Sequence, residues 1–253
     1  MSKSKIDLLA NEAHNLYYSK DFTGAAEKYQ EAANLTENLN RKVALFTSSG
    51  NCFRDAENYQ YAIELFRDAL NLVPKSGEHN ITNTTILFAK TSLSRGLNQL
   101  GLFEYKQKNF ESAYEYFIEG ADLTFNPKLK SACFVNAGQA AMRFDNFELA
   151  ITNYDSAMGL NYINPTLLKL KSQALVDLAD KCVGEEKFDM AKAHLRDAIK
   201  LVGDETLAGQ YKVKLSTICD ALGEKEGDNI SVIDLKDDPI EGVIVVGEAE
   251  EAG

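Results

Sequence analysis

The sequence predicts an all-α fold built from consecutive pairs of antiparallel helices. Apolar residues recur at helical spacing over most of residues 6–202. Short polar turns such as Glu57-Asn58 separate these apolar runs two by two, and Pro74 ends one of them. The same arrangement of small and bulky residues returns five times along the chain. A recurring unit of this size indicates a stack of helix pairs that share one continuous core.

Five aromatic residues mark the recurrence, and each is expected to open the second helix of a pair. They are Phe22, Tyr59, Phe110, Phe147 and Phe188. In every unit an alanine follows three residues later, a bulky apolar residue seven later, a small residue ten later and a leucine thirteen later. Nine residues before each aromatic, the first helix carries a small residue: Ala13, Gly50, Gly101, Gly138 or Ala179. Because two helices approach closely only where both present small side chains, these positions predict the contacts inside each pair.

This pattern, complete in residues 50–74, resembles the tetratricopeptide repeat (TPR), a helix–turn–helix unit of about 34 residues. The resemblance implies a right-handed superhelix whose concave wall is lined by the first helix of each unit. It also implies a protein-binding role. The chain departs from the family pattern in two ways: it has no tryptophan, and its aromatic anchors are spaced unevenly, by 37, 51, 37 and 41 residues.

Residues 1–222 are expected to form one solenoid domain. Its units are predicted at residues 5–39, 41–73, 84–123, 127–160 and 166–202, and a capping helix at residues 206–222. The third unit is irregular, because a polar loop precedes a helical pattern that runs over residues 84–107. The start of this long helix is expected to project beyond the stack. We interpret it as a contact site or as a tolerated insertion.

Residues 223–253 are predicted to form a disordered acidic tail. They hold ten acidic residues and two lysines, so they carry −8 of the chain's net charge of −11. Two short aliphatic motifs stand in this background: Val232, Ile233, Asp234 and Leu235, and then Val243, Ile244, Val245 and Val246. Each motif resembles the SUMO-interacting motif, which implies a ubiquitin-like modifier as a partner. The alternative is that one motif folds back on the helices.

Composition and motifs exclude several classes of function. The acidic balance argues against nucleic acid, which needs a basic stripe, and no apolar segment could span a membrane or act as a signal peptide. We therefore expect a cytoplasmic protein, with the nucleus as the alternative. Phosphate loops, nucleophile elbows and catalytic triads are all lacking, so no enzyme is expected. The three histidines have no ligand-like spacing to the four cysteines, so no metal or cofactor is expected, and the cysteines are predicted to be buried thiols: Cys52, Cys133, Cys182 and Cys219.

The TPR resemblance also implies where a partner would bind. Its inward-facing positions carry a set of mainly polar residues that suits a peptide or helical partner: Asn51, Arg54, Arg95, Asn98, Tyr105, Gln139 and Arg143, together with Thr47 and Val135. The alternative for each is ordinary solvated helix polarity. A TPR subclass clamps the terminal carboxylate of chaperone tails, but this chain has one useful basic residue at the matching positions, which are Ala10, His14, Ser48, Arg95 and Gln99. That clamp is not expected.

Two other functions remain open besides a protein-binding scaffold or adaptor. Residues 20–35 and 50–72 are similar to the repeats of SNAP adaptors, which link SNARE bundles to their disassembling ATPase. The body of the chain lacks the basic bias that acidic SNARE bundles would need. The second is a regulatory subunit or inhibitor that acts on an enzyme through the acidic tail.

Overall fold

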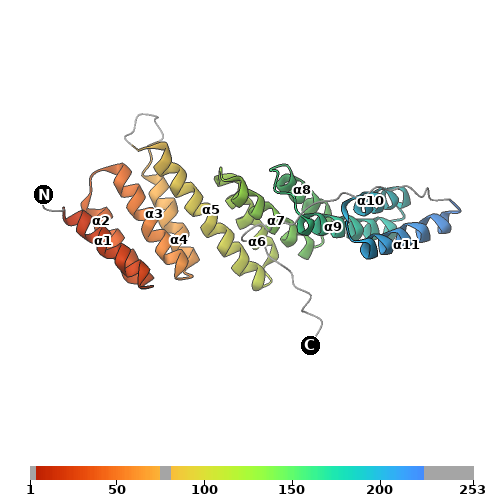
Figure 1. Ribbon diagram of the computed structural model, residues 1–253, viewed down its shortest axis with the longest axis horizontal. Helices are drawn as coiled ribbons and strands as arrows, with labels where there is room; N and C mark the ends of the chain where they lie inside the picture. Colours follow the sequence, from red (N-terminus) through yellow and green to blue (C-terminus); the bar gives the residue numbers. More distant parts are fainter. Residues whose placement is uncertain (1–3, 75–80, 225–253) are drawn as a thin grey trace. The chain divides into compact units, whose positions relative to one another are not determined.

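The computed structural model describes residues 4–74 and 81–224, and this part of the chain is all-helical (Figure 1). It contains eleven helices: α1 (Lys5–Tyr18), α2 (Phe22–Leu35), α3 (Leu39–Asp55), α4 (Tyr59–Asn71), α5 (Asn83–Lys106), α6 (Phe110–Leu123), α7 (Pro127–Arg143), α8 (Phe147–Met158), α9 (Pro165–Gly184), α10 (Phe188–Leu201) and α11 (Glu205–Leu222). The predicted all-α fold of five helix pairs and a capping helix is confirmed. All five aromatic anchors begin the second helix of their pair.

The turn inside each pair has the same construction. A residue with positive φ precedes the helix cap, at φ values of 57–67°: Lys20, Glu57, Lys108, Asp145 and Glu186. In the pairs that contain α2, α4 and α8, the next residue caps the second helix through its side chain. The backbone N–H of Gly24 donates to Asp21 Oδ1 (2.9 Å), and that of Leu149 donates to Asn146 Oδ1 (3.1 Å). These caps fix where the aromatic anchor enters the helix pair.

Three glycines allow the two helices of a pair to touch. A Cβ on Gly50 would lie 2.5 Å from Phe66 Cε1, and a Cβ on Gly101 would lie 2.6 Å from Phe117 Cε1. A Cβ on Gly138 would lie 2.4 Å from Tyr154 Cε1. The three rings are fully buried. The predicted contacts at the small positions are therefore real, and in these pairs even a methyl group does not fit without movement.

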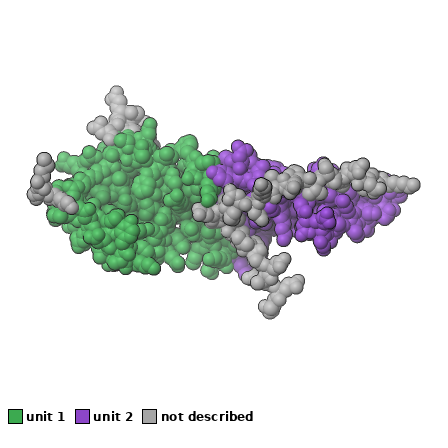
Figure 2. All heavy atoms as spheres, viewed as in Figure 1, with its two compact units in different colours: residues 1–107, 115–130 green, residues 108–114, 131–253 purple. Residues whose placement is uncertain are grey.

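The helices divide into two compact units (Figure 2). Unit 1 comprises residues 1–107 and 115–130, and unit 2 comprises residues 108–114 and 131–253. In unit 1, a cluster around Phe66 and Leu97 joins α4 to α5. In unit 2, the largest cluster packs α9, α10 and α11 around Leu195 and Leu215. All four cysteines are buried, as predicted, and none of them forms a disulfide.

The start of α5 packs against α3 and α4, contrary to the expectation that it projects beyond the stack of helix pairs. Ile81 and Ala89 are buried in a cluster with Val43 and Ala69, so the residues before and along the first turns of α5 lie on α3 and α4. The backbone N–H of Thr82 also donates to Asn40 Oδ1 (2.9 Å). The sequence before this helix is mostly polar, so the packing of its one buried apolar residue, Ile81, was not predicted. The last helix, α11, ends at Leu222 and is capped by Gly223, whose φ is 70°.

Candidate functional site

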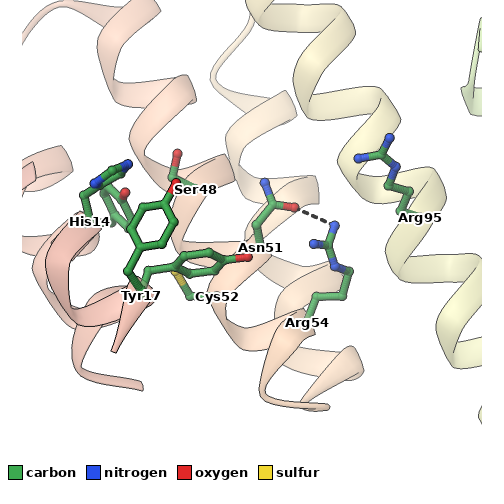
Figure 3. Close-up of a pocket in the computed structure, with 9 residues that line it drawn as sticks. His14, Tyr17, Ser48, Asn51, Cys52, Arg54 and Arg95 are labelled. Atoms are coloured by element: carbon green, nitrogen blue, oxygen red, sulfur yellow. Dashed lines mark hydrogen bonds between the residues drawn. The ribbon is translucent and has the colours of Figure 1, made fainter. Parts of the chain in front are cut away.

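A pocket of about 230 Å³ opens on the first helices of unit 1 (Figure 3). Its lining comes from α1, α3 and α5, with one residue from α2: His14, Tyr17, Tyr18, Tyr29, Ser48, Asn51, Cys52, Arg54 and Arg95. We call the surface that these residues form the unit 1 wall. It holds three tyrosines, two arginines and no acidic residue.

A hydrogen-bond network fixes one side of the pocket. Tyr17 Oη donates to Asp55 Oδ2 (2.6 Å), which ties α1 to α3. Arg54 donates from Nε and Nη2 to Asp55 Oδ1 (2.9 and 2.7 Å) and from Nη1 to Asn51 Oδ1 (2.9 Å), the last bond being drawn in Figure 3. The charge of Arg54 is thus offset by Asp55, and the Asn51 amide is oriented with its NH₂ group left over.

The same network sets the protonation of Tyr17. Its hydrogen bond to Asp55, together with burial, raises the pKa of Tyr17 to about 12. Burial also raises the pKa of Cys52 to about 12, so this thiol stays protonated at neutral pH and is a poor nucleophile. Neither side chain suits catalysis by proton transfer or nucleophilic attack near neutral pH.

Arg95 lies on the α5 side of the pocket. Its side chain is exposed, and within residues 4–74 and 81–224 it makes no hydrogen bond or ion pair. Of the two pocket arginines, Arg54 is the one whose charge is offset by an acidic side chain among the residues that the structure describes. The pocket therefore carries one positive charge that a ligand could neutralise.

The α1 side of the pocket is aromatic. The ring centroids of His14 and Tyr18 lie 4.5 Å apart in an edge-to-face contact, and those of Tyr17 and Tyr18 lie 5.9 Å apart. Tyr18 is 72% exposed. Tyr29 contributes a half-buried ring from α2, and burial raises its pKa. A pocket that combines exposed aromatic side chains with an arginine is typical of a protein-binding surface.

Comparison with solved structures decides the fold. The TPR repeats protein BF2334 from Bacteroides fragilis is 19% identical over 85% of this chain and 100% of its own, with a TM-score of 0.51. The chain has a TPR fold. YrrB, described as a TPR protein with an unusual peptide-binding site, is 18% identical over 81% of this chain and 90% of its own (TM-score 0.41). MamA from Desulfovibrio magneticus RS-1 is 15% identical over 79% and 97% (TM-score 0.46). No protein-family model and no curated protein matches the sequence.

The structure brings three of the predicted groove residues together in the pocket, namely Asn51, Arg54 and Arg95. Tyr105 is half-buried further along α5 and does not line it. Arg143 belongs to unit 2, where its guanidinium lies 4.8 Å from the centroid of the Phe110 ring. Whether any of these residues binds a partner stays a prediction.

Four of the inward-facing TPR positions are buried instead of facing solvent. Asn98 and Gln139 are each 3% exposed, and Thr47 and Val135 are also buried. The Thr47 hydroxyl donates to the Val43 carbonyl of its own helix (2.7 Å). Ser48, the next residue, lines the pocket in its place. The expected solvent-facing placement of these four was wrong because neighbouring helices cover that side of the first helices.

Sequence reasoning missed most of the aromatic lining. His14 and Ser48 were considered only as positions of the chaperone-tail clamp, and Tyr17, Tyr18 and Tyr29 were not considered as groove residues. The adjacent pair Tyr17-Tyr18 in the last turn of α1, one turn beyond His14, was the available indication. The two aliphatic motifs at residues 232–235 and 243–246 lie outside the described residues, so they stay predictions. No helix in the described part of the chain is long and apolar enough to cross a membrane.

Proposed function

We propose that this chain is a non-catalytic binding scaffold that holds a peptide or short helical segment of a partner protein on the unit 1 wall. The observation that carries the proposal is the pocket between α1, α3 and α5, with exposed Tyr18 on one side and, on the other, Arg95, which has no partner within residues 4–74 and 81–224. Tyrosine and arginine are the residue types that most often dominate binding energy at protein interfaces.

The internal network of the wall also supports binding. Hydrogen bonds join four side chains across α1 and α3, namely Tyr17, Asp55, Arg54 and Asn51. Because their positions are set before a partner arrives, binding orders few side chains and loses less entropy. The TPR fold of the chain is compatible with this role.

The pocket residues do not favour catalysis as an alternative function. The only pocket thiol, that of Cys52, is buried with its pKa raised to about 12. His14 has an aromatic contact with Tyr18 and no hydrogen bond to a hydroxyl or thiol in the part of the chain that the structure describes. Neither a SNAP-type adaptor nor an enzyme regulator is favoured by any particular residue of the wall, so we do not propose them.

The test is affinity capture from native lysate with four full-length baits, followed by mass spectrometry. The baits are the native chain, Tyr18→Ala, Phe125→Ala and a tail variant that combines Val232→Asp with Ile244→Asp. Phe125 is the matched control, because it is a similarly exposed aromatic residue of unit 1 (75%) that does not line the pocket.

We expect the native chain, the Phe125 variant and the tail variant to retain the same partners and the Tyr18 variant to lose them. Because Tyr18 is mostly exposed, the substitution should leave the circular dichroism spectrum unchanged. Partners that survive Tyr18→Ala but disappear with the tail substitutions would move the binding function away from the unit 1 wall and refute the proposal.

A further inference from the structure

We propose that the unit 1 pocket binds an extended, proline-rich segment of its partner in the polyproline II conformation. This inference rests on the proposed function and names the class of segment that the unit 1 wall holds. It follows from three properties of the pocket, which are its adjoining aromatic rings, its excess of hydrogen-bond donors and the internal bonds that occupy its acceptors.

The aromatic rings of α1 form a corner at one end of the pocket. The ring planes of Tyr17 and Tyr18 stand at 89° to each other, with centroids 5.9 Å apart, and the His14 ring lies edge-on to Tyr18 at 4.5 Å. Tyr17 Oη is committed to Asp55, so Tyr17 presents mainly its ring to a ligand. A rigid prolyl ring can pack in such a corner, and aromatic-lined grooves are the surfaces in which proline-rich segments dock.

The polar groups of the pocket mostly donate hydrogen bonds. Asn51 Oδ1 accepts from Arg54, and the NH₂ group of Asn51 makes no hydrogen bond to the residues that the structure describes. Asn51, on α3, lies between the α1 side chains and Arg95 of α5 (Figure 3). An arginine side chain has five N–H donors and no acceptor. A bound segment is therefore best held through its carbonyl oxygens.

Few acceptors remain for the N–H groups of a bound segment. None of the described residues that line the pocket is acidic. Asp55, behind Arg54, accepts from Tyr17 through Oδ2 and from Arg54 through Oδ1. What remains are hydroxyl groups such as that of Ser48, whose Oγ donates to the Ala44 carbonyl (3.0 Å) and can still accept. An ordinary peptide would bury N–H groups without acceptors, which is unfavourable, whereas proline has no N–H.

The same balance favours an extended segment over a helix. In an α-helix each backbone carbonyl already accepts from the N–H group four residues later, so the donors of the pocket would find the carbonyls occupied. In the polyproline II conformation the chain has no internal hydrogen bonds, so its carbonyls are free to accept. Proline also keeps the unbound segment in this conformation, which lowers the entropy cost of binding.

The experiment measures the binding of four nine-residue peptides to the full-length chain by fluorescence polarisation. Each peptide carries an N-terminal fluorescein and an amidated C-terminus, and has five central residues of one type between two glycine-serine pairs. The central residue is proline, alanine, N-methylglycine or glutamate. N-methylglycine lacks the N–H as proline does, but it has no ring and does not hold the polyproline II conformation.

We expect the proline peptide to bind about tenfold or more tightly than the alanine peptide, because one buried N–H without an acceptor costs that much. The N-methylglycine peptide should fall between them, since it removes N–H groups but offers no ring to the tyrosines. Tyr18→Ala should lower the affinity for the proline peptide toward that for the alanine peptide, and Tyr18→Phe, which keeps the ring, should retain it. The matched control is Phe125→Ala, which removes an exposed aromatic side chain of unit 1 outside the pocket.

Asn51 tests the donor argument separately. Asn51→Asp preserves the shape of the side chain and the bond accepted from Arg54, but it replaces the NH₂ donor with a second acceptor. We expect this variant to bind the proline peptide about tenfold more weakly and to keep the unfolding midpoint of the native chain in urea.

Equal binding of the proline and alanine peptides, or no binding of either, would overturn the proline assignment. Tightest binding of the glutamate peptide would do the same, as would full affinity for the proline peptide in Tyr18→Ala or Asn51→Asp. These results would leave the scaffold proposal intact, because the capture of native partners from lysate tests it without regard to their sequence. Failure of the scaffold proposal is read from that capture, in which Tyr18→Ala would then retain every partner.

Discussion

Substitution of Gly101 by alanine should destabilise the chain relative to the same substitution at a helical glycine where the new Cβ would meet no neighbouring atom. Gly101 packs on Phe117, and the new Cβ would lie 2.6, 2.8 and 3.0 Å from three atoms of the buried ring. Carbon atoms in contact normally lie about 3.5–4.0 Å apart, so ring and helix must separate by about 1 Å. Overpacking of this kind costs about 1–3 kcal/mol.

The helix itself gains from the same change, so a reference is needed. Alanine is favoured over glycine inside a helix by about 1 kcal/mol. Gly209 on α11 provides the reference, because a Cβ there would meet nothing within 4 Å. We expect Gly209→Ala to raise the free energy of unfolding by about 1 kcal/mol. Gly101→Ala should then fall about 1–3 kcal/mol below Gly209→Ala, which is the cost of the clash alone.

The assay is urea unfolding followed by circular dichroism, since the chain has no tryptophan to report by fluorescence. A second background tests the cause. The fifth helix pair has Ala179 and Leu195 at the positions of Gly101 and Phe117, so Phe117→Leu should make room for the new methyl group. In that background Gly101→Ala should be neutral or stabilising. Equal effects in both backgrounds, or a stability of Gly101→Ala equal to that of Gly209→Ala, would refute the reasoning.

Three further predictions concern single side chains. Asp55→Asn should bring the pKa of Tyr17 down from about 12 toward its ordinary value of 10. In a pH titration, the tyrosinate absorbance of Tyr17 should then rise at a lower pH, and Tyr17→Phe should abolish this contribution. Since folding keeps the Tyr17 proton that the unfolded chain loses, native stability should fall as pH rises from 10 toward 12, and less steeply in either variant. Burial raises the pKa of Asp177, so its ionised form weakens the fold at neutral pH. Asp177→Asn should therefore raise the unfolding midpoint at pH 7 and leave it unchanged at about pH 3, where the carboxyl is protonated in the folded and unfolded states. A lower midpoint at pH 7 would contradict this. Thr82→Ala removes the acceptor for the Thr85 N–H at the start of α5 and should cost about 1 kcal/mol in urea unfolding; an unchanged midpoint would show that the cap is not needed.

Helix starts could be predicted from sequence because the residues that decide them are local. The five aromatic anchors each begin a helix, and the preceding turn needs only two or three residues to form. The left-handed residues in those turns were not predicted, because none of them is the glycine that usually marks this conformation. Lys20 and Glu57, for example, give no compositional indication of positive φ.

The pocket could be predicted only in part, because its walls are joined by tertiary contacts. Tyr17 and Asp55 are 38 residues apart, and nothing in either helix alone indicates their hydrogen bond. The choice between Thr47 and Ser48 is similar. Their side chains point about 100° apart on α3, and only the packed fold shows that Thr47 is buried while Ser48 lines the pocket.

Packing and surface chemistry are separate properties of these repeats. The residue eight before each aromatic anchor is His14, Asn51, Leu102, Gln139 or Asp180. Two of these line the pocket, Gln139 is buried, and Asp180 accepts a hydrogen bond from Lys214 on α11. The packing positions beside them hardly vary, so the repeat fixes the helix pairs but not the ligand. Stability should therefore respond to Gly101 and not to Tyr18, and partner binding should respond to Tyr18 and not to Gly209.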